Sequence, residues 1–156
     1  MKGINVEVRD AVLENENVIY VAKPHENQIP DDNTYALIHE EVFHNGIIDV
    51  DVRSRLLPTA DEMNRGFIGI VFRAKEDASE FESFYIRPTN GNTDDPVRKQ
   101  HGCQYFSYPG YTFSYFRKHG IELPVTCKWG SGKEEWNKKV PVVKLNLLIL
   151  TGELKQ

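Results

Sequence analysis

Three acidic side chains on predicted strands are the candidates for hydrolytic chemistry. Asp49 and Asp51 alternate with apolar residues, so both project from one face of a strand. Retaining glycosidases need two carboxylates about 5–5.5 Å apart, one as nucleophile and one as acid. Arg53 occupies the next position on this face, which fits equally a solvated strand with ion pairs, for example to Arg73. Glu82 on another strand is the third candidate, although alternation places it among apolar neighbours.

A second set of side chains suits sugar binding without catalysis. Sugars need planar hydrogen-bonding groups and an aromatic ring to cover the apolar side of the sugar ring. Arg73, Tyr85 and Arg87 supply this mixture from two neighbouring predicted strands. Gln104 and Tyr105 lie on a further strand but on opposite faces, so only one of them can join the set. The alternative is structural: Arg87 bonds backbone carbonyls of the loop that follows it, and Gln104 satisfies a buried strand edge.

One loop has a partial calcium-binding pattern. Asn90, Asn92 and Asp94 offer oxygen ligands at positions one, three and five of a calcium-type loop. The pattern then breaks, because Asp95 replaces the glycine at position six and His101 replaces the glutamate at position twelve. The same residues fit a polar loop that runs into a helix cap. We therefore expect no cofactor, with calcium at this loop as the alternative.

A period of two dominates the chain and predicts the elements that position these residues. The clearest strands are expected at 46–55, 66–74, 81–87 and 103–107, and weaker ones at 4–8, 18–22, 35–43 and 140–150. Gly69 leaves a gap on its strand face, so another group can approach the backbone there. Short helices are expected at 95–102 and 112–120, each closed by glycine. Many short strands and almost no long helix predict an all-β fold.

The composition argues against several classes of protein. The chain has 156 residues, which suits a single domain over residues 1–156. Its net charge of −4 argues against a nucleic-acid binder that neutralises phosphates. No apolar run approaches the roughly 20 residues of a membrane span, and the first residues lack the apolar core of an export signal. We expect no nucleic-acid partner and no membrane partner, and the cellular compartment stays open.

The two cysteines, Cys103 and Cys127, form neither a disulfide framework nor a metal knuckle. Without an export signal, the favoured interpretation is a pair of partly buried thiols. A single bridge between them is the alternative if the protein is extracellular.

Five segments together resemble a known family. They are Gly46–Val52, Phe67–Arg73, Phe81–Pro88, Asp94–Arg98 and Gln104–Pro109. As a set they are similar to bacterial concanavalin A-like lectin/glucanase domains, which are laminin-G-like jelly rolls of the family 16 glycoside hydrolase-like group. The resemblance covers roughly residues 35–120. It implies a two-sheet antiparallel β-sandwich with one concave sheet and places Arg87 and Gln104 in motifs that this group shares.

Two features of the resemblance bear on function. Glucanases of this fold alternate three acidic residues along one strand, whereas this chain has only Asp49 and Asp51 before Arg53. The family also continues for some tens of residues beyond the matching part, so we expect the closing C-terminal strands to be missing or irregular. The first hypothesis is a carbohydrate-binding, lectin-like module. The alternatives are a glycoside hydrolase and an assembly module that pairs through exposed strand edges, for example with a second copy.

Overall fold

The computed structural model describes residues 1–24, 26, 32–38, 45–62, 64–91 and 93–121, together with the strand at 143–149. Its strands are β1 (Lys2–Ile4), β2 (Glu7–Leu13), β3 (Glu16–Ala22), β4 (Tyr35–Leu37), β5 (Gly46–Val52), β6 (Ile68–Phe72), β7 (Phe81–Ile86), β8 (Cys103–Tyr108) and β9 (Val143–Ile149). Its helices are α1 (Pro88–Gly91), α2 (Pro96–Lys99) and α3 (Phe113–Lys118). The prediction of an all-β chain with short helices is confirmed.

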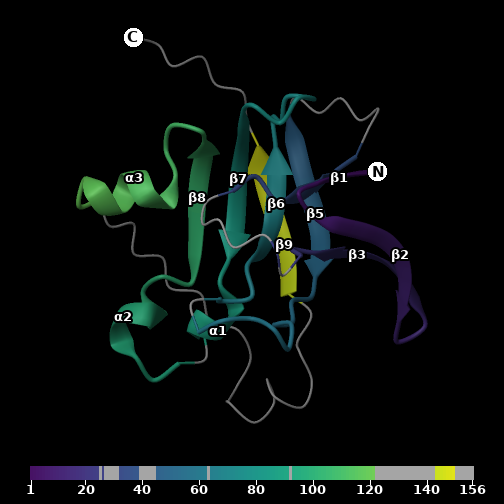
Figure 1. Cartoon of the computed structure of the whole chain (residues 1–156), viewed down its shortest axis with the longest axis horizontal. Coiled ribbons are helices and arrows are strands. Elements are labelled where there is room, and N and C mark those ends of the chain that lie inside the picture. Colours follow the sequence, from purple (N-terminus) through teal and green to yellow (C-terminus); the bar gives the residue numbers. More distant parts are fainter. Residues whose placement is uncertain are drawn as a thin grey trace.

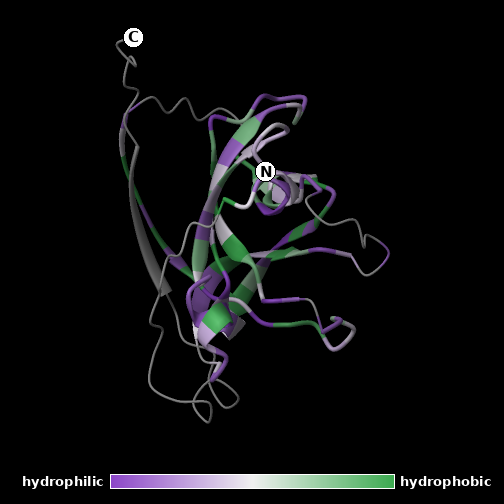
Figure 2. Ribbon diagram, turned by 90° about the vertical axis from the view of Figure 1, so that its left-hand side faces the viewer, coloured by the Kyte–Doolittle hydropathy of each residue, from purple (hydrophilic) through white to green (hydrophobic). Residues whose placement is uncertain are grey.

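The strands pair in small antiparallel sheets, of which β6–β7–β8 is the largest in the described part of the chain (Figure 1). Polar and apolar residues alternate regularly along β5, and hydrophilic and hydrophobic segments follow one another along the ribbons in Figure 2. Because cross-strand partners share a face, the pairs Gly69–Tyr85 and Tyr85–Gln104 fix the two faces of this sheet. The Tyr85 face carries Gly69, Val71, Phe81, Ser83, Tyr85, Gln104 and Phe106. The Phe84 face carries Ile68, Ile70, Glu82, Phe84, Ile86, Cys103 and Tyr105.

The Tyr85 face is partly covered by the β1–β4 pair. Tyr35 of β4 packs against Phe81 with ring centroids 4.9 Å apart, and Phe106 completes the aromatic core at 5.5 Å from Phe81. Two residues that the sequence pattern placed in solvent are buried on this side of the sheet. Ser83 is only 6% exposed and Arg87 only 8%. The prediction of an open polar strand face is therefore wrong for these two residues, because β7 has packed residues on both faces and Phe113 of α3 lies against Arg87.

The Phe84 face packs against β5. Val50 and Val52, which alternate along β5, contact a cluster that contains Phe84 and Ile86. Ile86 is 1% exposed, so this cluster excludes water from the middle of the sheet. The predicted inward face of β5 is confirmed.

Cys103 lies in the same cluster and is 4% exposed. It is disulfide-bonded, so the favoured interpretation of a free thiol is wrong for this residue. The chain has one other cysteine, Cys127, which lies outside the described residues.

β2 and β3 form a hairpin on the side of the molecule opposite α3 (Figure 1). Its turn consists of Glu14 and Asn15, both with positive φ, 52° and 69°. A two-residue turn with two positive φ angles matches the twist of the flanking strands. Glu14 also forms a 3.1 Å ion pair with Arg53, which ties the hairpin tip to the end of β5. The sequence pattern predicted only part of this hairpin.

The two predicted helices are present. α2 begins after Asp95, whose side chain accepts hydrogen bonds from the backbone N–H groups of Val97 and Arg98 at 2.9 and 3.2 Å. α3 is followed by Gly120, which has a φ of 62°. α1 was not predicted. Within the described ranges, no helix combines the length and the apolar character that crossing a bilayer requires.

Candidate functional site

Three of the predicted binding residues meet at one end of the Tyr85 face. Tyr85 of β7 and Gln104 of β8 are direct cross-strand partners. Arg87 follows the end of β7, and its backbone N–H donates to the Gly102 carbonyl at 2.7 Å. This bond keeps the segments next to β7 and β8 together beyond the paired strands. We call Tyr85, Arg87 and Gln104 the Arg87 cluster.

Hydrogen bonds connect all three members of the Arg87 cluster. Arg87 Nη2 donates to the Tyr85 hydroxyl at 3.1 Å and to Gln104 Oε1. The Tyr85 hydroxyl donates to the same Gln104 oxygen at 3.0 Å. Arg87 Nε is buried and has no hydrogen-bond partner. The cluster therefore holds a buried guanidinium on neutral acceptors and leaves one of its donors unsatisfied, which is a costly arrangement for a charged group.

Aromatic rings surround this guanidinium. Arg87 Cζ lies 5.5 Å from the Tyr85 ring centroid, 6.0 Å from that of Phe67 and 5.4 Å from that of Phe113 in α3. Phe67 contacts Tyr85 edge to face at 5.8 Å and is still 53% exposed. Rings at these distances stabilise a cation through their negative faces. Phe67 thus presents an aromatic surface to solvent directly beside the buried charge.

Gly69 lies next to Tyr85 on the same face and is exposed. A Cβ atom at this position would lie 2.2 Å from the Phe84 carbonyl oxygen and 2.5 Å from Tyr85 Cα. The predicted close approach to the Gly69 backbone is confirmed, and the approaching group is the opposite strand.

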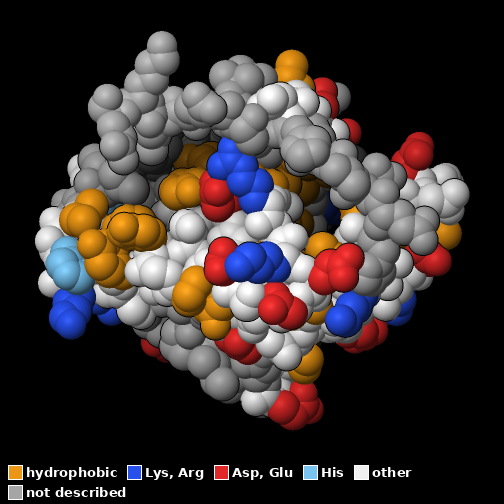
Figure 3. Space-filling model, turned by 90° about the horizontal axis from the view of Figure 1, so that it is seen from above, with side chains coloured by type: hydrophobic (Ala, Val, Ile, Leu, Met, Phe, Trp, Pro, Cys, Tyr) orange, Lys and Arg blue, Asp and Glu red, His pale blue; other side chains and the backbone are white. Residues whose placement is uncertain are grey.

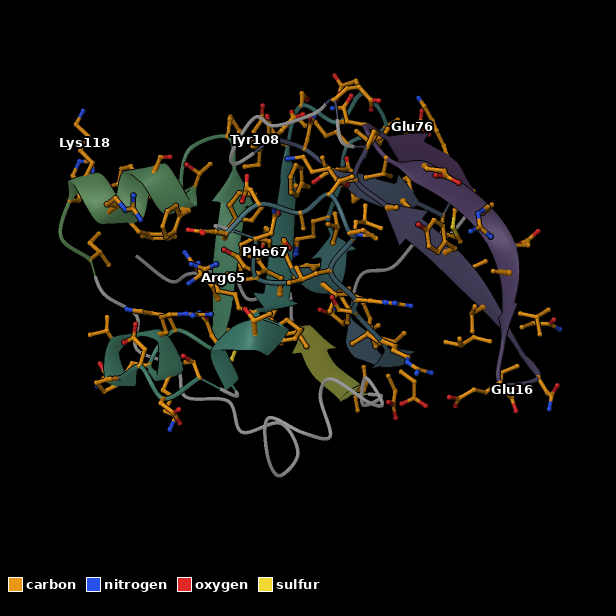
Figure 4. All side chains as sticks on the ribbon, turned by 60° about the horizontal axis from the view of Figure 1, so that its bottom comes forward. Glu16, Arg65, Phe67, Glu76, Tyr108 and Lys118 are labelled. Carbon is orange, nitrogen blue, oxygen red and sulfur yellow. The ribbon has the colours of Figure 1, made fainter. Side chains whose placement is uncertain are left out.

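Two further arginines lie close to the Arg87 cluster. Arg65 and Phe67, two residues apart before β6, are labelled next to one another in the view of Figure 4. The Arg65 carbonyl accepts a 3.2 Å bond from Thr89 N–H in α1. Burial lowers the pKa of the Arg65 guanidinium, and the charges of Arg98 and Arg87 lower it further, against the weaker opposite effect of Asp61. The Arg65 guanidinium is therefore close enough to those of Arg98 and Arg87 to be repelled by both.

The other two predicted binding residues lie in a different cluster. Arg73 Nη1 contacts both carboxylate oxygens of Glu82, at 2.8 and 3.0 Å, and the Tyr105 hydroxyl donates to Glu82 at 2.9 Å. Arg73 has a φ of 52°, so the chain leaves the regular strand there and alternation no longer predicts its side. The prediction that Arg73 joins Tyr85 and Arg87 is wrong, and of the pair on β8 it is Gln104, not Tyr105, that joins them. Burial raises the pKa of the Tyr105 phenol, and Glu82 adds to that effect.

The candidate acids do not converge. Asp49 and Asp51 are exposed on β5, as predicted, on the strand face opposite to the valines that pack toward β7. Glu82 lies on the Phe84 face of β7, bound to Arg73. The expected ion pair from this β5 face to Arg73 is replaced by the one with Glu82. Glu82 is therefore apart from Asp49 and Asp51 and does not form a two-carboxylate arrangement with either of them.

The partial calcium loop is used differently. Asn90 is 4% exposed, its Nδ2 donates to the His101 carbonyl at 2.9 Å, and its Oδ1 accepts from Arg98 Nε at 3.2 Å. An oxygen that receives an arginine is not available to a cation. Asn92 lies outside the described residues, and Asp94 is exposed. Among the described residues, no group of three histidine, cysteine or acidic side chains is placed to hold a metal ion.

Sequence reasoning missed Arg65, Phe67, Arg98 and Phe113 as parts of this site. The pattern did place Phe67 on the same strand face as Gly69, so alternation carried a usable signal for that ring. Nothing in the spacing marks the other three, which come from separate loops and helices.

Comparisons with known proteins add no relative: no protein-family model, no curated protein and no solved structure matches this chain.

Proposed function

We propose that this chain is a carbohydrate-binding module without catalysis of its own, built as a two-sheet antiparallel jelly roll of the concanavalin A-like kind. The antiparallel strands and the resemblance of residues 46–109 support this fold. The observation that carries the function is the 53% exposed ring of Phe67 beside the Arg87 cluster. An exposed ring covers the apolar side of a sugar, and the neighbouring polar groups bond its hydroxyls directly or through water.

The separation of Asp49 and Asp51 from Glu82 favours binding over hydrolysis. We therefore assign sugar contact to Phe67 and hydrogen bonding to the polar groups beside it.

The test is calorimetric titration of a panel of neutral and acidic oligosaccharides, with Phe67→Ala as the variant. We expect Phe67→Ala to weaken binding about 2- to 10-fold, since an aromatic contact contributes about 0.5–1.5 kcal/mol. Tyr111→Ala is the matched control, because Tyr111 is similarly exposed, at 55%, and contacts Tyr115 instead of the Arg87 cluster. Absence of binding to every oligosaccharide at millimolar concentration, or equal losses in both variants, contradicts the proposal.

A further inference from the structure

Three arginines outside the candidate site are paired with acidic side chains. Arg9, Arg53 and Arg73 each form an ion pair with a glutamate, at 3.2, 3.1 and 2.8 Å. Basic and acidic side chains also lie next to one another on the face seen in Figure 3. The three arginines at the site, which are Arg65, Arg87 and Arg98, form no ion pair with any carboxylate of the described residues, and neither do Arg55 and Arg117. What distinguishes the three is that they lie close to one another.

Neutral groups take the place of those carboxylates. Arg65 Nη1 donates to the backbone carbonyls of Glu62 and, at 3.0 Å, Asn64. Arg98 donates to the side-chain oxygens of Asn90, at 3.2 Å, and Thr89, at 3.3 Å. A guanidinium has five N–H donors, so these bonds leave donors free on both side chains. The hydrogen bonds orient the groups but cancel none of their charge.

Arg87, the buried arginine of the three, adds to this uncompensated positive charge. Arg87 is 8% exposed, its Nε has no partner, and its two side-chain bonds go to a hydroxyl and an amide oxygen. Nearby rings offset part of the cost of burying this charge. An anion beside Phe67 would offset more of it, because interactions between charges are strong where water is partly excluded.

Guanidinium groups match carboxylates geometrically, through two parallel N–H···O bonds. Phe67 supplies the ring surface next to them. We infer that the ligand of this site is an acidic oligosaccharide, whose sugar ring lies on Phe67 and whose carboxylate lies in the combined field of Arg65, Arg87 and Arg98. This inference rests on the proposed function and specifies the class of sugar.

The experiment compares uronate tetrasaccharides with their methyl esters, which keep the sugar ring and remove the charge. We expect each acid that binds to bind at least about 10-fold more tightly than its ester, and to weaken as salt is added. Arg65→Gln should remove most of this difference, because it weakens binding of the acid more than binding of the ester. The matched control is Arg9→Gln, on β2, which should leave both affinities unchanged. Thermal unfolding of both variants verifies that they are folded.

Each other outcome has a defined meaning. Equal binding of acid and ester overturns this inference and leaves the proposed function standing. Binding of a sulfated tetrasaccharide, inorganic phosphate or acetate as tightly as the uronate overturns the assignment of a carboxylated sugar. Absence of binding by any sugar overturns both proposals. An equal loss in Arg65→Gln and Arg9→Gln overturns the role of the three arginines.

Discussion

Removing the Tyr85 hydroxyl tests whether the hydrogen bonds of the Arg87 cluster stabilise the fold. In Tyr85→Phe the ring stays, and with it the edge contacts to Phe67 and Phe106 at 5.8 and 6.2 Å. The variant loses the 3.1 Å bond from Arg87 and the 3.0 Å bond to Gln104. A bond to a charged group contributes about 1.5–3 kcal/mol and a neutral one about 0.5–1.5 kcal/mol. Because Arg87 keeps its bond to Gln104, we expect the free energy of unfolding to fall by about 2 kcal/mol, toward the lower end of that sum.

The assay is urea unfolding followed by circular dichroism, with a thermal scan beside it. A loss of about 2 kcal/mol corresponds to a fall in Tm of roughly 4–8 °C for a chain of this size. Tyr111→Phe is the control, because that side chain is 55% exposed and lies outside the cluster. A loss in Tyr85→Phe below about 0.5 kcal/mol, or one equal to the control's, would refute the reasoning, since it would mean that the buried charge does not depend on this hydroxyl.

Two further predictions concern the same sheet. Gly69→Ala should lower the free energy of unfolding by about 1–3 kcal/mol, because the new Cβ would lie 2.2 Å from the Phe84 carbonyl oxygen. Gly110→Ala is the control and should leave the free energy of unfolding unchanged, because a Cβ there has no atom within 4 Å. Equal urea midpoints of the two variants would contradict this prediction. The raised pKa of Tyr105 means that its neutral phenol, bonded to Glu82, adds stability below the ordinary pKa of 10.0 and that this is lost as the pH rises further. In an ultraviolet titration, Tyr105→Phe should therefore lose a phenol ionisation step that lies above pH 10 in the unchanged protein. If the lost step lies below pH 10, the pKa of Tyr105 is lowered and the prediction is wrong.

The strands could be predicted because alternation is a local property of the chain. Side-chain direction along β5 is fixed by a period of two, so the inward valines and the exposed aspartates followed from the pattern alone. The glycine-closed end of α3 was equally readable, because Gly120 has a φ of 62°. The predicted glycine stop of α2 is wrong, because α2 ends at Lys99 with Gln100 as its cap and Gly102 has no positive φ. The hairpin β2–β3 was only partly predicted, because its turn uses Glu14 and Asn15 in place of the usual glycine.

Burial and side-chain partners could not be predicted, because they depend on which segments meet. Ser83 and Arg87 alternate like solvent-facing residues, yet β4 and α3 cover this face. Arg73 follows its strand by one residue, and a single positive φ angle changes which carboxylate it meets. Disulfide formation at Cys103 likewise depends on a partner that the local pattern does not identify.

β7 serves two interiors at once, since Tyr85 contributes to one side of the sheet and Ile86, one residue later, to the other. A substitution in β7 would therefore disturb the packed cluster on one side of the sheet or the other. Arg65 and Phe67 precede β6, outside any helix or strand, and do not belong to the buried clusters on the two faces of β7. If the proposed sugar binding is correct, we expect substitutions that change its selectivity to be tolerated at Arg65 and Phe67, and substitutions of Arg87, Tyr85 and Gln104 to destabilise the fold.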